Sequence, residues 1–162
     1  MRESPITDLA QAIQSAINAE SDAIKFYDDA AKKSIDPRGR DMFEQLMRFE
    51  KAHFISLRQL LDSLNKNPEV HYEGTAFDRL PPGVPRMELL SQYRQTDIDA
   101  LNIAIEAEKK ANAAYTRLAA QTADSAIKNF FAKLAEEEDL HRMVLEDQFF
   151  ALANKGYWTW GE

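Results

Sequence analysis

Two short segments of this 162-residue chain carry side chains suited to binding metal ions. In each, a Glu is followed three positions later by a His: Glu50 with His53, and Glu138 with His141. On a helix, residues three apart project from the same face about one turn apart. Both side chains of a pair can therefore reach one point beside the helix. A single such pair is common on protein surfaces, whereas two in one chain are a more specific signal.

A lone Glu precedes each pair by 30 residues: Glu20 for the first pair and Glu108 for the second. Both interrupt an apolar stripe with helical spacing, and an ionised carboxylate facing a core costs on the order of several kcal/mol unless a partner or a cation neutralises it. Four carboxylates and two imidazoles form the ligand set of a two-metal site inside a four-helix bundle. The candidate ligands are Glu20, Glu50, His53, Glu108, Glu138 and His141.

Apolar periodicity and capping signals predict four long helices and an all-α fold. Ser4-Pro5 and Asp36-Pro37 are N-cap-and-proline starts, and Gly156 is a typical helix stop. The expected helices run from residue 5 to about 33, from 37 to about 65, from about 96 to 121, and from 122 or 124 to about 155. Residues 1–156 then form one bundle domain, followed by an aromatic tail at 157–162 that we expect to cover the bundle or a neighbouring subunit.

Residues 66–95 lack helical periodicity and contain several prolines, with one short helical turn expected at about 87–93. A helix of this length spans about 40 Å, and an extended linker of about 30 residues is long enough to return along it. The second and third helices can therefore be parallel, as in bundles with one long crossover.

The chain contains an internal repeat. Shifted by 88 residues, positions 16–53 align without a gap on positions 104–141, and 12 of the 38 pairs are identical. The identical pairs include all six candidate ligands and also Tyr27 with Tyr115. The two helical hairpins are therefore expected to pack around a pseudo-twofold axis that passes through the metal pair.

Composition restricts the possible partners. The net charge is −7, the pI is about 5.0, and no basic run indicates a nucleic-acid or membrane surface. Without cysteine, disulfides and cysteine-based metal sites are excluded within this chain. The first residues lack the pattern of a signal peptide, and no apolar stretch reaches membrane-spanning length, so a soluble cytoplasmic protein is expected.

These residues resemble the ferritin-like di-iron carboxylate superfamily and, within it, the rubrerythrin family. The resemblance rests on Glu20, on Glu50 with His53, on Glu108, on Glu138 with His141, and on a Tyr seven residues after each lone Glu. It implies a ferritin-like four-helix bundle with a long crossover that holds two iron ions, although manganese or mixed metals fit the same ligands.

The resemblance also implies a role for each ligand. Glu50 and Glu138 would bridge the two ions, Glu20 and His53 would be terminal ligands of one, and Glu108 and His141 of the other. Tyr27 and Tyr115 would orient carboxylates from outside the ligand set. No catalytic side chain is expected beyond the metal centre itself.

The chain departs from rubrerythrin in two respects. Rubrerythrins carry a rubredoxin-type site built from four cysteines, which this chain lacks, so electrons are expected from an external donor such as a rubredoxin-like protein. They also use an additional Glu one turn from the ligand on the third helix. Here the residues one turn from Glu108 are not acidic, and Glu106 points to a different face.

The resemblance further implies a homodimer.

The expected function is that of a di-iron oxidoreductase that reduces hydrogen peroxide or dioxygen. One alternative is a ferroxidase or iron-handling protein, for which Fe(II) is itself the substrate. A second alternative is a metal-free helical scaffold or interaction module whose buried charges form ion pairs.

Overall fold

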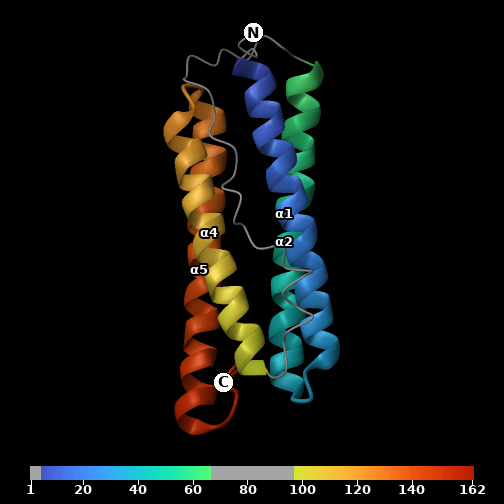
Figure 1. The fold of residues 1–162 in the computed structure, drawn as a ribbon, viewed down its shortest axis with the longest axis vertical. Coiled ribbons are helices and arrows are strands. Elements are labelled where there is room, and N and C mark those ends of the chain that lie inside the picture. The colour runs from blue at the N-terminus through green and yellow to red at the C-terminus, as the bar shows by residue number, and fades with distance from the viewer. Residues whose placement is uncertain (1–4, 67–96) are drawn as a thin grey trace.

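A computed structural model describes residues 5–66 and 97–162, which form a bundle of four long helices (Figure 1). The helices are α1 (Pro5–Lys33), α2 (Pro37–Lys66), α4 (Asp97–Gln121) and α5 (Ser125–Lys155). No strand occurs in these two ranges. The all-α four-helix bundle is thus confirmed, and each described boundary lies within a few residues of the expected one.

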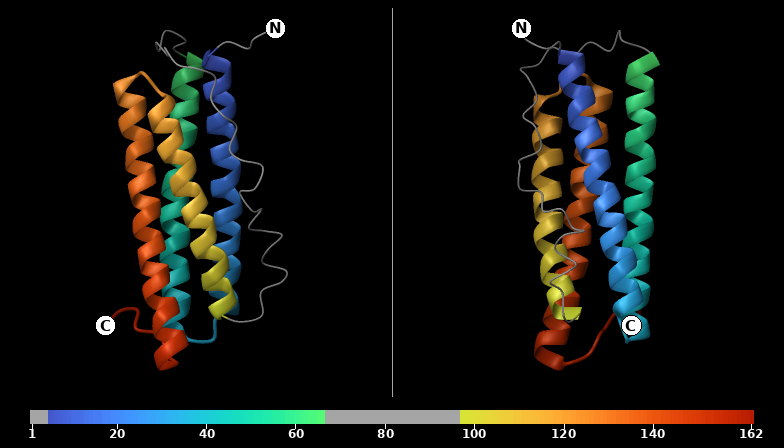
Figure 2. Two further views of the ribbon diagram at one scale, coloured as in Figure 1. Left: turned by 60° about the vertical axis from the view of Figure 1, so that its left-hand side comes forward. Right: turned by 45° about the vertical axis from the view of Figure 1, so that its right-hand side comes forward.

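The helices form two hairpins, in which α1 packs against α2 and α4 packs against α5. Figures 1 and 2 show that α2 and α4 run in the same direction, so that the end of α2 and the start of α4 lie at opposite ends of the bundle. This is the direction expected for a bundle with one crossover. Apart from Lys66, which ends α2, the expected linker and its short helical turn lie outside the described residues.

Equivalent aspartates of the repeat cap the start of the second helix of each hairpin. The Oδ1 atom of Asp36 accepts a hydrogen bond of 2.8 Å from the backbone N–H of Arg38, and Oδ1 of Asp124 accepts one of 3.0 Å from that of Ile127. Both satisfy N–H groups that a helix start leaves unpaired. At the end of α5, Gly156 adopts the left-handed conformation with φ 82°.

The apolar core consists of two clusters at different heights along the bundle. One includes Ile13, Leu57 and Phe131, and the other includes Phe26, Phe43 and Leu101. On every helix the candidate ligand lies in sequence between the residues of one cluster and those of the other. The ligands are therefore held in a polar layer with apolar packing on both sides. Among the described helices, none combines the length and the hydropathy needed to cross a membrane.

The aromatic tail closes one end of the bundle through Trp158, which is 2% exposed. Its ring packs edge-to-face against Phe43 at 5.7 Å, and its Nε1–H donates to Oδ2 of Asp97 at 3.3 Å. Asp97 begins α4 and also accepts a hydrogen bond of 3.1 Å from Ser34, which follows α1. Trp158 thereby joins the two hairpins at this end. The expectation that the tail covers the bundle is confirmed for Trp158.

Gly39 on α2 leaves the space that Trp158 occupies. A Cβ atom at this position would lie 2.6 Å from Cε2 of Trp158 and 2.6 Å from Oγ of Ser34. An exposed helical Gly→Ala change stabilises a helix by about 1 kcal/mol. We predict the opposite sign here: Gly39→Ala lowers the free energy of unfolding by about 1–3 kcal/mol, as overpacking does. Chemical denaturation measures this, and in a Trp158→Leu background the same change should cost much less. Equal costs in both backgrounds would contradict the steric explanation.

Candidate metal centre

The structure brings all six candidate ligands together in the polar layer of the bundle. Their ligand atoms form two groups, within each of which the atoms lie within 4.8 Å of one another. One group contains Glu20, Glu50, His53 and Glu138, and the other contains Glu50, Glu108, Glu138 and His141. No ligand residue is more than 7% exposed. Glu50 and Glu138 occur in both groups, which is the arrangement that two bridging carboxylates require.

The two hairpins contribute to the site reciprocally. Nδ1 of His53 on α2 lies 2.9 Å from Oε1 of Glu138 on α5, and Nδ1 of His141 on α5 lies 3.0 Å from Oε1 of Glu50 on α2. Glu20 and Glu108 are farther from the same nitrogens, at 3.6 Å from His53 and 3.7 Å from His141. This exchange of contacts agrees with the pseudo-twofold axis that the repeat predicts.

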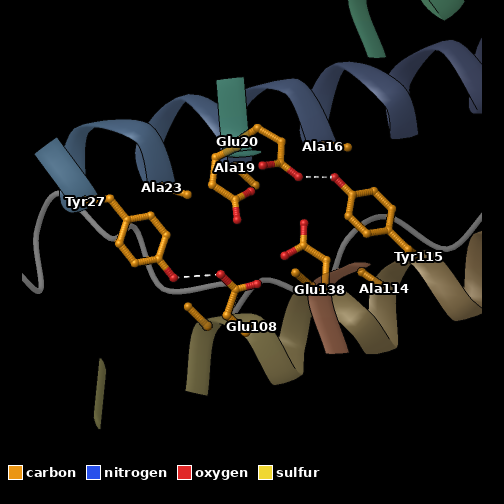
Figure 3. Close-up of a pocket in the computed structure, with 12 residues that line it drawn as sticks. Ala16, Ala19, Glu20, Ala23, Tyr27, Glu108, Ala114, Tyr115 and Glu138 are labelled. Carbon is orange, nitrogen blue, oxygen red and sulfur yellow. Dashed lines mark hydrogen bonds between the residues drawn. The ribbon is translucent and has the colours of Figure 1, made fainter. Parts of the chain in front are cut away.

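Two tyrosines link the hairpins through the carboxylates of Glu20 and Glu108 (Figure 3). The hydroxyl of Tyr27 on α1 donates to Oε1 of Glu108 on α4, and that of Tyr115 on α4 donates to Oε1 of Glu20 on α1, both at 2.6 Å. Each Tyr therefore contacts the lone Glu of the opposite hairpin rather than the one on its own helix. These contacts fix one oxygen of each carboxylate and leave the other directed toward the cluster.

A small cavity of about 40 Å³ lies among the carboxylates and the two tyrosines. Alanines from α1 and α4 form much of its remaining wall, including Ala19, Ala23 and Ala114 (Figure 3). A buried space needs about 10–15 Å³ to hold one water molecule. The cavity can therefore hold a few small atoms beside the carboxylates, and its short side chains leave that space open.

The four carboxylates differ in their preference for a proton. Burial raises the pKa of Glu50 and Glu138 well above the usual value of 4.5, and the charge of Glu108 adds to the effect at both. Burial also opposes the ionisation of Glu20. Interactions with Glu50 and with the imidazole of His53 outweigh this effect and lower the pKa of Glu20. The same balance, with Glu138 as the partner, lowers the pKa of Glu108 to about 2. The shared carboxylates therefore have the stronger preference for a proton.

The imidazoles are held in their charged form. Burial alone would lower the pKa of His141, but its close contacts with the carboxylates of Glu108 and Glu138 raise it from 6.5 to about 12. The pKa of His53 rises strongly for the same reason. Burial raises the pKa of Tyr27 and Tyr115 well above 10, so both remain hydrogen-bond donors. The raised pKa values of the two imidazoles mean that the metal-free cluster retains protons that a metal would displace.

Several buried atoms of the cluster lack a well-directed hydrogen bond within the described ranges. They are Oε2 of Glu20, Oε1 of Glu50 and Nδ1 of His141, and the last two lie 3.0 Å apart without the alignment of a hydrogen bond. Unsatisfied buried polar atoms are rare in folded proteins, because each loses its hydration without compensation. Oxygen and imidazole nitrogen are also the donors that iron and manganese accept. The residues present therefore fit a pair of divalent cations.

Two further residues contact the imidazoles and were not identified from the sequence. Oε2 of Glu137 lies 2.6 Å from Nε2 of His53, and the ring of Phe49 lies over that of His141 with centroids 5.3 Å apart. Both line a groove of about 490 Å³ between α2 and α5 that also reaches Trp160. The only sequence signal for them is that the repeat aligns position 49 with position 137.

The absence of an acidic residue one turn from Glu108 is confirmed. Ala111 occupies that side of α4 and lines the cavity, whereas Glu106 is exposed and pairs with Lys109 at 3.2 Å. Asn112 donates a hydrogen bond of 2.7 Å to the carbonyl of Ala135 and so holds α4 against α5. In the described residues, no fifth carboxylate joins the two ligand groups.

Comparison with known proteins supports the family resemblance. The family model named Rubrerythrin matches residues 4–61, which span α1 and most of α2 and include three of the six candidate ligands. Searches of curated proteins and of solved structures found no significant match. The second hairpin repeats the ligand positions of the matched one and completes two overlapping groups of ligands. The chain is thus similar to rubrerythrin over its first hairpin, and the buried Glu/His cluster of its four-helix bundle fits a di-iron site.

Proposed function

We propose that this protein is a di-iron oxidoreductase that reduces hydrogen peroxide or dioxygen. The observation that carries the proposal is the pair of buried ligand groups that share Glu50 and Glu138. A structural ion pair does not require carboxylates common to two sets of ligands, whereas two cations a few ångström apart do. The ligands are Glu20, Glu50, His53, Glu108, Glu138 and His141, and iron is the proposed metal, with manganese or a mixed pair compatible with the same donors.

When bound, two ferrous ions supply two electrons, which is the number needed to convert hydrogen peroxide and two protons into two water molecules. The chain sets the conditions for this exchange. Four carboxylates balance the charge of two divalent cations, which makes their burial tolerable. Tyr27 and Tyr115 hold Glu108 and Glu20 from outside the cluster, so that these carboxylates keep their orientation. The cavity of about 40 Å³ restricts access to small oxidants.

The reducing electrons must come from elsewhere, because this chain contains no cysteine for an iron–sulfur or rubredoxin-type site. We therefore propose an external electron donor such as a rubredoxin-like protein. A homodimer and a cytoplasmic location complete the proposal, and both rest on the family resemblance and the composition.

The first prediction concerns metal content. The parent protein, purified after expression with iron, should contain about two metal ions per chain. Glu138→Ala removes a ligand that both groups share and should reduce the content to well under one ion. Glu136→Ala is the matched control, because Glu136 is exposed on the same helix and outside both groups. Elemental analysis measures the three proteins. Equal metal in all of them would exclude the site and favour a metal-free scaffold.

The second prediction concerns the pH dependence of the metal-free protein. His53 and His141 have pKa values raised above 6.5, so the folded state keeps protons that the unfolded chain releases above that pH. Their stabilising contribution is therefore complete below pH 6.5 and is lost as the pH rises toward about 12 for His141. The raised pKa values of Glu50 and Glu138 act in the same direction above pH 4.5.

In a chelator-treated sample, the unfolding temperature should therefore fall between pH 6.5 and pH 9. Salt screens repulsion between surface charges but acts much less on buried groups, so the trend should persist at high ionic strength. Divalent metal should reverse the trend, because deprotonated ligands bind it more tightly. Calorimetric scans with and without metal test this, and an unfolding temperature that rises with pH in the metal-free protein would contradict it.

The third prediction separates the oxidoreductase from a ferroxidase. Protein loaded anaerobically with two ferrous ions and freed of excess iron should consume about one hydrogen peroxide per two ferrous ions oxidised, as the electron balance requires. Continued turnover should need an added electron donor. A ferroxidase would instead oxidise many added Fe(II) ions per site without such a donor. Residual peroxide and chelatable Fe(II) measure both outcomes, and the Glu138→Ala variant supplies the background.

A further inference from the structure

The internal repeat gives the two halves of the cluster the same ligands, but it places different side chains beside the two imidazoles. The ligands, the two tyrosines and the capping aspartates are all identical in the two hairpins. Position 49 on α2 and position 137 on α5, each just before the shared carboxylate, are equivalent in the repeat but hold Phe and Glu. The difference is chemical as well as steric, since only one of these side chains can accept a hydrogen bond.

Glu137 interacts with the far side of His53. Nδ1 of this imidazole faces the cluster, 2.9 Å from Glu138, while its Nε2 lies 2.6 Å from Oε2 of Glu137. His53 is buried, whereas the side chain of Glu137 is 37% exposed at the groove. The carboxylate of Glu137 therefore accepts a hydrogen bond from Nε2–H. This contact fixes the orientation of the ring and leaves Nδ1 to bind a metal ion in the cluster.

His141 has an apolar neighbour instead. The ring of Phe49 lies over it at 5.3 Å and is inclined by 34°. Within the described residues, the short contacts of His141 with carboxylates all involve Nδ1, on the side of the cluster. This imidazole is thus positioned by packing, without a carboxylate that accepts a proton from its Nε2.

We infer that the two metal positions are inequivalent and that Glu137 is the positioning residue responsible. This inference rests on the proposed function. A carboxylate hydrogen-bonded to the remote N–H of a histidine ligand makes that ligand more basic and typically changes metal affinity about 10- to 100-fold. The position formed by Glu20, Glu50, His53 and Glu138 therefore fills first. The position formed by Glu50, Glu108, Glu138 and His141 fills second and exchanges its ion more readily.

The experiment titrates the chelator-treated full chain with zinc, a diamagnetic divalent ion, and follows the imidazole nitrogens of 15N-histidine-labelled protein by NMR. The chain contains three histidines, so the signals can be assigned by substitution. At one equivalent of zinc, the Nδ1 signal of His53 should be shifted and that of His141 largely unchanged. A second equivalent should then shift His141.

Two variants test the role of the carboxylate. Glu137→Gln keeps the shape of the side chain but removes its charge, and it should weaken the first binding step about 10- to 100-fold, so that the two histidines titrate together. Phe49→Glu supplies the missing carboxylate to the other hairpin at a position that is 51% exposed, and it should tighten the second step. Glu136→Gln, which removes the same charge one residue away, should leave both steps as in the parent.

Each outcome has one meaning. Simultaneous shifts of His53 and His141 in the parent protein, or equal behaviour of the Glu137→Gln and Glu136→Gln variants, would overturn the inequivalence while leaving the two-metal site intact. Failure of the parent to bind zinc at either histidine would overturn the proposed function and the inference with it.

Discussion

The structure depends on neutralising six ionisable groups that the fold buries in one layer. An isolated ion loses too much hydration to be stable in an apolar interior. In the metal-free protein, the raised pKa values of the histidines and of Glu50 and Glu138 favour bound protons, which lower the net negative charge of the layer. Two divalent cations would neutralise the layer by displacing those protons. The same cluster can thus be satisfied in two ways, and the balance between them is set by pH and metal concentration.

The bundle gives this layer its rigidity by placing apolar packing above and below it. Cross-hairpin hydrogen bonds from Tyr27 and Tyr115 act within the layer, and Trp158 ties the hairpins together at one end. The backbones of the two hairpins come close to each other at only a few places within the described residues. The hairpins are therefore held together largely by side chains, and the cluster itself is a substantial part of their interface.

Much of this arrangement could be predicted from the sequence because periodicity and repetition are local signals. The helical spacing of Glu50 and His53 identified a shared face, and the shift of 88 residues showed that both hairpins carry the same ligands. Capping residues such as Asp124 placed helix starts to within a residue or two. The length of the segment between α2 and α4 allowed these helices to be parallel, and the structure shows that they are (Figure 1).

Other contacts depend on how the hairpins meet, which the sequence does not encode locally. The spacing of seven residues places each Tyr on the same face as the lone Glu of its own helix, about two turns away, but does not show that it contacts the carboxylate of the opposite hairpin. Glu137 looked like one more acid in an acidic run, and its contact with His53 joins residues 84 positions apart. The close approach of Gly39 and Trp158 likewise arises only when the tail folds back onto α2.

The placement of the tail has a spectroscopic consequence. Both tryptophans of the chain lie in it, yet their surroundings differ: Trp158 is enclosed by the core, and Trp160 is partly exposed in the groove that reaches His53 and His141. Intrinsic fluorescence therefore combines the emission of a shielded tryptophan at the end of the bundle with that of a partly exposed one in the groove. A soluble quencher that reaches only Trp160 would separate the two and turn its emission into an optical reporter of the groove.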